Sequence, residues 1–204
     1  MKKLLLIVLP LFLSVGFSQQ IIHTETYENG NIKSITSHKE TRNRIEKVKE
    51  VQYHENGQKR VEVTYKDGKE DGLQTEWYEN GQKYRERNYK DGREDGLWTI
   101  WYENGQKKSE ETYKDGKEDG LQTEWYENGQ KREEVTMKGF RKKDGKWTSW
   151  YENGQKKSEW TYKDGKYISS IYWNEDGSEA PPPPAQSVAK KDVPPPPPSH
   201  RRNN

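Results

Sequence analysis

The 204-residue sequence contains no cysteine. That absence excludes disulfide bonds, thiolate zinc sites, a cysteine nucleophile and a lipid-modified cysteine. The sequence also has little material for an ordinary core, because hydrophobic residues make up only 27% of the chain and charged residues make up 34%. Such a composition is typical of disordered chains. The aromatic residues argue against disorder in the middle of the chain, since most of the eight Trp and thirteen Tyr recur at fixed positions.

Motifs for catalysis are also missing from the sequence. There is no Ser-His-Asp pattern, and no glycine loop carries the Gly-Lys-Ser/Thr that grips a nucleotide. The histidines are scattered and lack metal-ligand spacing; they are His23, His38, His54 and His200. We therefore predict that the protein is not an enzyme and that it has no cofactor and no metal site.

Paired acids recur at Glu70-Asp71, Glu94-Asp95 and Glu118-Asp119. Two carboxylates can perform acid–base chemistry or bind calcium together with other oxygen ligands. A catalytic pair is normally singular, whereas these pairs recur with the turns of a repeat. We therefore interpret them as turn and solubility residues, with a calcium site in the Asp-Gly loops as the lesser alternative.

The formal net charge of +2 is unevenly distributed. Lys2 and Lys3 contribute +2 and the segment after Ala180 contributes +3, so residues 19–180 carry −3. Binding of nucleic acid requires a concentrated basic face. The mildly acidic body therefore predicts no nucleic-acid partner.

Residues 1–18 have the pattern of a secretory signal peptide. A basic start is followed by an apolar run from Leu4 to Phe17, and small residues precede Gln19. The run is short for a membrane span of about 20 residues. We predict cleavage near Ser18 and a periplasmic or extracellular mature protein; an uncleaved membrane anchor is the alternative.

The stretch Trp-Tyr-Glu-Asn-Gly-Gln-Lys begins at Trp77, Trp101, Trp125 and Trp150. A fixed period of 24 or 25 residues indicates a repeat architecture. In each repeat, runs rich in aromatic and β-branched residues lie on both sides of Asn-Gly, which predicts a β-hairpin. A polar connection with Asp-Gly turns leads to the next hairpin. The structural repeat residues are therefore Trp77, Trp101, Trp125, Trp150, Gly81, Gly105, Gly129 and Gly154.

Two hairpin loops fit this pattern. A three-residue Glu-Asn-Gly loop would place Leu121 opposite Val135 and Glu124 opposite Arg132. A two-residue Asn-Gly loop would place Glu124 opposite Glu133, which is unfavourable for directly opposed residues. We favour the three-residue loop, with a type I turn and glycine in the left-handed conformation.

Strand alternation separates two aromatic columns. We expect the Trp column to supply the core between hairpins, because each aromatic residue can bury about 150–250 Å²; an exposed ladder for glycans or a partner is the alternative. The Tyr column then lies on the other face, flanked by lysines, and is the better candidate for contact with a partner. These candidate contact residues are Tyr78, Tyr102, Tyr126, Tyr151, Lys83, Lys107, Lys131 and Lys156.

The two ends differ from the repeats. Residues 19–51 are expected to form a divergent first repeat or cap, since an end repeat has only one neighbour. Repeats then occupy residues 52–179. Residues 180–204 contain two polyproline runs and are predicted to be a disordered, basic, proline-rich tail.

The unit at residues 96–120, with its Trp-Tyr-x-Asn-Gly and Tyr-x-x-Gly-x-x-x-Gly elements, closely resembles the MORN-repeat variant found in YwqK-type antitoxin proteins. The resemblance covers about residues 52–177. It implies an all-β fold in which consecutive β-hairpins form an elongated, twisted antiparallel sheet. It also implies a binding role toward partner proteins or membrane lipid.

The sequence thus predicts an exported scaffold that binds a protein partner through one aromatic and charged face of its sheet. A module that binds cell-wall polysaccharide is one alternative. Association with a membrane surface through the basic tail is another, although the tail carries few positive charges.

Overall fold

A computed structural model describes residues 5–7, 20–40, 44–139 and 142–182. In these residues every regular element is a β-strand, and the strand pairings are antiparallel. The all-β prediction of consecutive hairpins is therefore confirmed for this part of the chain. Because the described residues form no helix, none of them belongs to a helix that could span a membrane. Most of the predicted leader, and the predicted tail from residue 183 on, lie outside the described residues.

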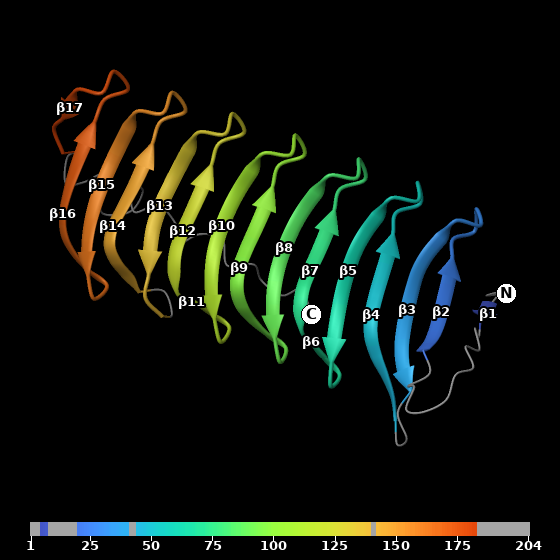
Figure 1. Ribbon diagram of the computed structural model, residues 1–204. Coiled ribbons are helices and arrows are strands. Elements are labelled where there is room, and N and C mark those ends of the chain that lie inside the picture. Colours follow the sequence, from blue (N-terminus) through green and yellow to red (C-terminus); the bar gives the residue numbers. More distant parts are fainter. Residues whose placement is uncertain (1–4, 8–19, 41–43, 140–141, 183–204) are drawn as a thin grey trace. The chain divides into compact units, whose positions relative to one another are not determined.

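The chain divides into two compact units, residues 1–117 with 127–129 and residues 118–126 with 130–204. In the first unit, strands β2 to β10 lie side by side in chain order (Figure 1), and β1 pairs with β2. The bounds in this unit are β1 (Leu5–Ile7), β2 (Gln20–Thr26), β3 (Ile32–Glu40), β4 (Ile45–Tyr53), β5 (Lys59–Lys66), β6 (Lys69–Glu70), β7 (Gly72–Trp77), β8 (Lys83–Lys90), β9 (Arg93–Trp101) and β10 (Lys107–Lys114).

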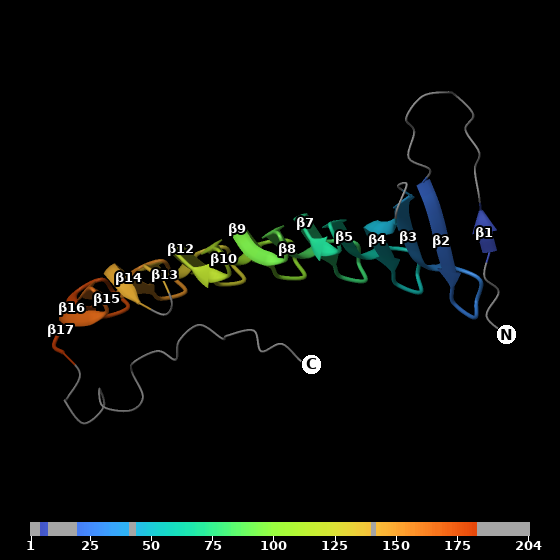
Figure 2. The same cartoon turned by 90° about the horizontal axis from the view of Figure 1, so that it is seen from below.

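The short strand β11 (Lys117–Glu118) lies at the boundary between the units. The strands of the second unit also follow one another in chain order, each paired with the next. They are β12 (Gly120–Trp125), β13 (Lys131–Met137), β14 (Lys143–Trp150), β15 (Lys156–Lys163), β16 (Lys166–Trp173) and β17 (Glu179–Ala180). Figure 2 shows the same strands seen from below.

The Glu-Asn-Gly segment forms the three-residue loop that the sequence favours. In the β7–β8 hairpin, the amide of Gly81 donates to the Tyr78 carbonyl at 3.0 Å, and the amide of Tyr78 donates to the Gln82 carbonyl at 2.9 Å. Gly81 has a φ of 83°, which side chains with a Cβ rarely adopt. A Cβ at Gly81 would also lie 2.8 Å from Oε1 of Gln58. The backbone conformation therefore requires glycine here, and a Cβ would in addition displace the end of the Gln58 side chain.

The register expected from that loop is wrong by one residue. Trp125 pairs with Lys131 as expected, but Glu124 then pairs with Glu133, and Arg132 is the extra residue of a β-bulge. A bulge inserts one residue on one strand and shifts every later pair. Leu121 consequently pairs with Thr136 instead of Val135. The like-charged pair that we considered unfavourable is therefore present, and Arg132 contacts Glu124 at 3.3 Å from the bulge.

The second turn of a repeat is a two-residue Asp-Gly turn at Asp67, Asp91, Asp115 and Asp164, whereas the connection between β13 and β14 is longer and has a different sequence. Asp91 has a φ of 50° and Gly92 a φ of 79°, as a type I′ hairpin turn requires. The acid pairs Glu70-Asp71 and Glu94-Asp95 connect successive turns of this kind. The Asp71 carboxylate accepts the Asp91 amide at 3.1 Å, and the Glu70 carbonyl accepts the Gly92 amide at 2.8 Å. These acids therefore have a structural role in holding one turn against the next.

Both ends of the repeat array contain the three-residue loop that is described above for the β7–β8 hairpin. Gly30 donates to the Tyr27 carbonyl at 3.1 Å, so residues 20–40 form a full hairpin. At the other end, strand β17 makes only two pairs with β16, between Tyr172 and Ala180 and between Trp173 and Glu179. Pro181 follows directly. Because proline has no backbone N–H to donate, it is unsuited to continue this return strand.

The buried hydrophobic residues contradict our assignment of the core to the Trp column. Trp77, Trp101, Trp125 and Trp150 are all only half-buried. In the first unit the buried hydrophobic side chains are Val51, Val63, Trp98 and Ile100. In the second unit they are Val135, Met137, Trp147 and Trp160, which pack with Tyr162 and Tyr172.

Position along the strand explains this difference. Trp101 is the last residue of its strand, next to the turn. Trp98 lies inside the same strand, between Arg87 on β8 and Glu111 on β10, and its ring lies 4.4 Å from that of Tyr113. An interior position with long side chains on both neighbouring strands is shielded from water, whereas a position beside a turn is partly open.

Candidate interaction surface

Tyrosines of the turn connect each repeat to the next. The Tyr78 hydroxyl donates to the Trp101 carbonyl at 2.8 Å, and the Tyr126 hydroxyl donates to the Trp150 carbonyl at 2.9 Å. Tyr151 reaches the Trp173 carbonyl in the same way at 3.0 Å. Each bond replaces water on a half-buried carbonyl, so these hydroxyls stabilise the stacking of hairpins.

Asparagines form a second inter-repeat connection at the tip of the turn. Oδ1 of Asn80 accepts the Gln82 amide at 2.9 Å, and Nδ2 of Asn80 donates to the Glu103 carbonyl of the next turn at 3.3 Å. The first contact holds the local turn, and the second binds the turn of the following repeat. Asn56, Asn104 and Asn153 donate to the next turn in the same way.

The turn lysines lie over the tryptophans of the next repeat. Nζ of Lys83 is 5.5 Å from the centre of the Trp101 ring and 2.5 Å from the Glu86 carboxylate. Lys156 has the same contacts with Trp173 and Glu159. A cation over an indole face is attracted by the ring quadrupole. Lys83 and Glu86 share a face although they lie three residues apart, because the bulge residue stands between them.

These hairpins match a known repeat. A family model described as MORN repeat variant matches five segments, residues 48–67, 70–91, 94–115, 118–138 and 143–164. The matches are consecutive and together cover more than half of the chain.

The chain belongs to the MORN repeat variant family. MORN repeats are scaffold modules that generally bind proteins or membranes and are not themselves catalytic. A comparison with curated proteins gave no match. The narrower resemblance to YwqK-type antitoxin proteins stays a prediction.

The predicted contact residues of the MORN repeats have structural roles in the described chain. Tyr78, Tyr126 and Tyr151 bind backbone carbonyls, and Tyr102 lies beneath Lys108, whose Nζ is 5.5 Å from its ring centre. The lysines contact acids on their own strands as well. These pairs are Lys83–Glu86, Lys107–Glu110, Lys131–Glu134 and Lys156–Glu159. Whether any of these residues also contacts a partner stays a prediction.

One face of the sheet repeats the same side chains in almost every MORN repeat, and we call it the constant face. It carries Thr75, Trp77, Lys83, Glu86 and their equivalents. The threonines are buried; they are Thr75, Thr99, Thr123 and Thr148. The same contacts recur from repeat to repeat. This face therefore has the pattern expected of side chains that hold neighbouring hairpins together.

The opposite face changes from repeat to repeat, and we call it the variable face. It carries Gln74, Glu76, Arg85, Arg87 and their equivalents. The positions equivalent to Glu76 hold Gln52, Ile100, Glu124 and Ser149. The positions equivalent to Arg87 hold Val63, Glu111, Val135 and Trp160. The repeat fold therefore tolerates different chemistry on this face, which leaves the face available for recognition.

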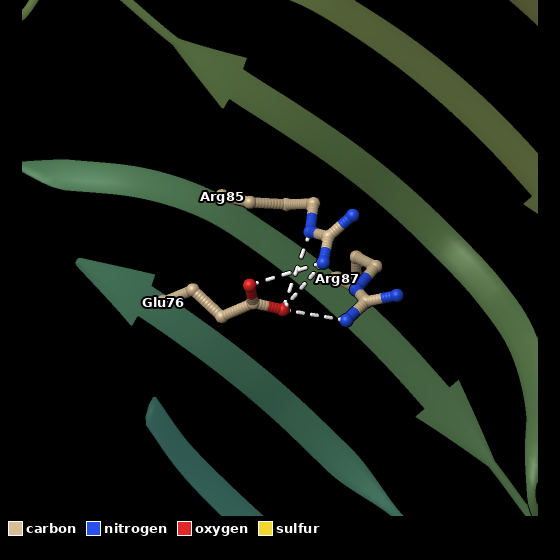
Figure 3. A network of polar contacts seen from close by, with 3 residues as sticks. All are labelled: Glu76, Arg85 and Arg87. Atoms are coloured by element: carbon tan, nitrogen blue, oxygen red, sulfur yellow. Dashed lines mark hydrogen bonds and ion pairs between the residues drawn. The ribbon is translucent and has the colours of Figure 1, made fainter. Parts of the chain in front are cut away.

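The first unit has an acid between two arginines on its variable face (Figure 3). Arg85 binds the Glu76 carboxylate through Nε at 3.2 Å and through Nη2 at 2.7 and 3.0 Å, and Nη2 of Arg87 binds the same carboxylate at 2.6 Å. All three side chains are 17% exposed. Two guanidinium groups thus share one carboxylate and leave one positive charge in excess.

The second unit has an aromatic cluster on its variable face. Trp147 and Trp160 lie opposite one another on β14 and β15, with ring centres 6.4 Å apart. Nζ of Lys143 lies 3.1 Å from the Trp147 ring centre, and burial lowers the pKa of Lys143 to about 8. Burial, and then the neighbouring Glu124, raise the pKa of Glu133. Charged groups on this face are therefore held in partly desolvated surroundings.

The variable face was not among the predicted sites, although the sequence contains a signal for it. Alternate strand positions that differ between repeats mark that face, whereas the recurring Trp-Tyr-x-Asn-Gly stretch marks the turn. Arg85 and Arg87 could have been found by aligning the repeats of this chain with one another. Their contact with Glu76 required the bulge-shifted register, which the sequence pattern did not reveal.

Proposed function

We propose that this MORN repeat protein is an exported, non-enzymatic scaffold that binds a protein partner on the variable face. One observation carries the proposal: the constant face keeps nearly the same Thr, Trp, Lys and Glu contacts along the repeats, whereas the variable face differs at equivalent positions. Contacts between neighbouring hairpins require the same side chains in each repeat. Recognition of a particular partner requires side chains that differ between repeats. The family supports binding in general, and the predicted signal peptide supports export.

The constant face offers the competing surface. It bears exposed leucines at Leu73 (45% exposed), Leu97 (43%) and Leu121 (50%). A partner could pack on such apolar groups, and so could a lipid surface. These leucines occupy equivalent positions and offer the same apolar contact in each repeat, so they fit partners less selectively than the variable face does.

Photo-crosslinking tests the two faces with a matched pair of neighbouring residues. A photoreactive amino acid placed at Gln74 lies on the variable face, and one placed at Leu73 lies on the constant face. The exported protein is expressed in its own cells and irradiated. We expect a protein adduct from position 74 that is absent from position 73.

The opposite outcome would overturn the proposal. An adduct from position 73 alone would assign binding to the constant face. Retention of purified protein on bare peptidoglycan or glycan, without any protein adduct, would replace the protein partner by a polysaccharide. Because Leu73 is more accessible than Gln74, simple exposure cannot produce the expected result.

A further inference from the structure

A row of three residues on the variable face has unfilled hydrogen-bonding capacity. Gln74, Arg87 and Trp98 lie opposite one another across β7, β8 and β9. Each has a buried polar atom without a hydrogen-bond partner; these atoms are Gln74 Oε1, Arg87 Nε and Trp98 Nε1. Buried polar atoms are nearly always paired in folded proteins. Two unpaired donors and one unpaired acceptor therefore lie in one row, beneath the side chains that line this part of the face.

The adjoining row toward the turn supplies positive charge. Glu76 and Arg85 lie opposite one another, and both Arg85 and Arg87 bind the single Glu76 carboxylate (Figure 3). The outer N–H groups of these guanidiniums extend beyond what one carboxylate can satisfy, since each guanidinium has five N–H donors. The preceding repeat has Val61 and Val63 at these two positions, so the pair is particular to this part of the chain.

Aromatic rings border the charged pair. The Arg87 guanidinium lies 5.2 Å from the Trp98 ring centre and 5.7 Å from the Tyr89 ring centre. The rings fix the plane of Arg87 and provide apolar surface beside its donors. Another acid on this face, Glu111, pairs with Trp98 and accepts a hydrogen bond from the Tyr113 hydroxyl at 2.8 Å. The Glu111 carboxylate repels an anion, so an anion is expected to approach from the side of Arg85.

We propose that Arg85 and Arg87 bind a carboxylate of an acidic peptide segment in the protein partner, with an apolar residue of that segment against Trp98. This inference rests on the proposed function, because it names the chemistry of the partner on the variable face. The planar forks of arginine match the two oxygens of a carboxylate. The excess positive charge supplies the complementarity, and the Trp98 ring supplies apolar surface beside the Arg87 guanidinium.

The test uses the full mature chain and a capped peptide of the sequence Glu-Leu-Glu, with Gln-Leu-Gln as its uncharged match. The indole N–H resonance of Trp98 reports on binding and is assigned by its loss in Trp98→Phe. We expect the acidic peptide to shift this resonance in a saturable manner and the uncharged peptide to leave it unchanged. A resonance that does not respond to the acidic peptide overturns the proposal.

Three variants of the site and one control set the direction of the effect. Arg85→Gln and Arg87→Gln each remove charge-assisted donors and should weaken binding about tenfold or more. Glu76→Gln frees both arginines and should strengthen binding, a result that a misfolded variant cannot produce. Glu86→Gln makes the same charge change on the constant face and should leave affinity unchanged. Equal strengthening by Glu76→Gln and Glu86→Gln would show attraction by net charge alone and overturn the site.

Inorganic phosphate provides the competing anion. Saturable binding of phosphate that depends on both arginines, without binding of the acidic peptide, would replace the carboxylate by a phosphate group. A peptide that does not bind can be distinguished from a proposed function that is wrong. A protein adduct from position 74 with no peptide binding would retain the variable face and reject only the acidic segment.

Discussion

The hydroxyl of Tyr78 donates a hydrogen bond to the backbone carbonyl of Trp101, one full repeat further along the chain, at 2.8 Å. The side chain belongs to one hairpin and the acceptor to the next, so the bond forms only when the two hairpins stack. Burial, the largest cause, raises the pKa of Tyr78 above its ordinary value. The hydroxyl therefore keeps its proton, and remains a donor, across the physiological range of pH.

Removal of this hydroxyl should destabilise the protein without altering its shape. We expect Tyr78→Phe to lower the free energy of unfolding by about 1 kcal/mol, the usual net value of one intramolecular hydrogen bond. Urea denaturation followed by tryptophan fluorescence measures the change. Tyr84→Phe, on the neighbouring strand, is the control and should have little effect. Unchanged stability of Tyr78→Phe combined with lost partner binding would instead assign Tyr78 to the contact surface.

The two tryptophans of β9 should differ sharply on truncation. Trp98 is buried (6% exposed), whereas Trp101 is half-buried beneath Lys83. We expect Trp98→Ala to cost about 3–5 kcal/mol, as for other buried aromatic residues. Trp101→Ala should cost clearly less. Thermal unfolding of both variants under identical conditions decides the order, and an equal or reversed loss would return the core to the Trp column.

The local turns could be predicted because their causes are local. Glu-Asn-Gly and Asp-Gly contain the residues that tolerate positive φ, and the period of 24 residues places them at regular intervals. The register could not be predicted from these turns alone, because Arg132 enters a bulge after a correctly predicted loop. The bulge allows Lys131 and Glu134 to pair on one face, a contact that depends on strand geometry and is not visible as an alternating pattern.

The core was assigned to the wrong tryptophans for a related reason. The Trp column recurs, and recurrence was taken to indicate burial. In the structure this recurrence follows from contacts between neighbouring hairpins beside the turn, where the rings of Trp77, Trp101 and Trp150 lie beneath lysines. Burial depends on position within the strand and on the size of neighbouring side chains, which is why Trp98, Trp147 and Trp160 are buried although their positions vary between repeats. The candidate site also lies at positions that vary, because the residues equivalent to Arg85 and Arg87 differ between repeats.

Cleavage of the leader can be tested directly. We expect the secreted form to begin at Gln19, because small residues precede it and the apolar run ends there. Within the predicted leader, Leu5–Ile7 pairs with β2 in the full chain. Cleavage would therefore leave β2 as the first strand of the sheet. N-terminal sequencing of protein recovered from its native cells measures the start, and recovery of intact Met1 would exclude the proposed export route.

The opposed acids on β12 and β13 should limit stability at neutral pH. Glu124 and Glu133 pair directly, and burial, followed by Glu124, raises the pKa of Glu133. A raised pKa means that the folded state holds a proton more tightly than the unfolded state, so stability falls as pH rises through the folded pKa. Glu133→Gln should therefore raise the free energy of unfolding at pH 7.

The neighbouring residue gives a matched control for this change. Glu134 lies on the constant face and is paired with Lys131, so Glu134→Gln makes the same change in net charge but removes a favourable contact. We expect it to have no stabilising effect. If both variants gain equal stability in urea denaturation, the net charge of the chain, and not the Glu124–Glu133 pair, limits stability.

Lys143 should make the second unit sensitive to alkaline pH. Burial lowers its pKa from 10.5 to about 8, so between these two values the unfolded lysine holds a proton that the folded lysine has lost. Stability then rises with pH across that window, because the unfolded state binds more protons there. Below about pH 8 both states are charged, and the folded state bears the full cost of a half-buried ammonium beside Trp147.

Lys143→Met removes both the charge and this dependence. Urea denaturation of the wild type and the variant at pH 7, 8, 9 and 10 should show the variant relatively most stable at pH 7, with its advantage shrinking toward pH 10. Lys142→Met, which removes the exposed partner of Asp164, is the control and should leave the pH dependence unchanged. A constant difference between Lys143→Met and the wild type at all four pH values would contradict the lowered pKa. It would leave the contact with Trp147, in which Nζ lies 3.1 Å from the ring centre, as the main energetic role of the lysine.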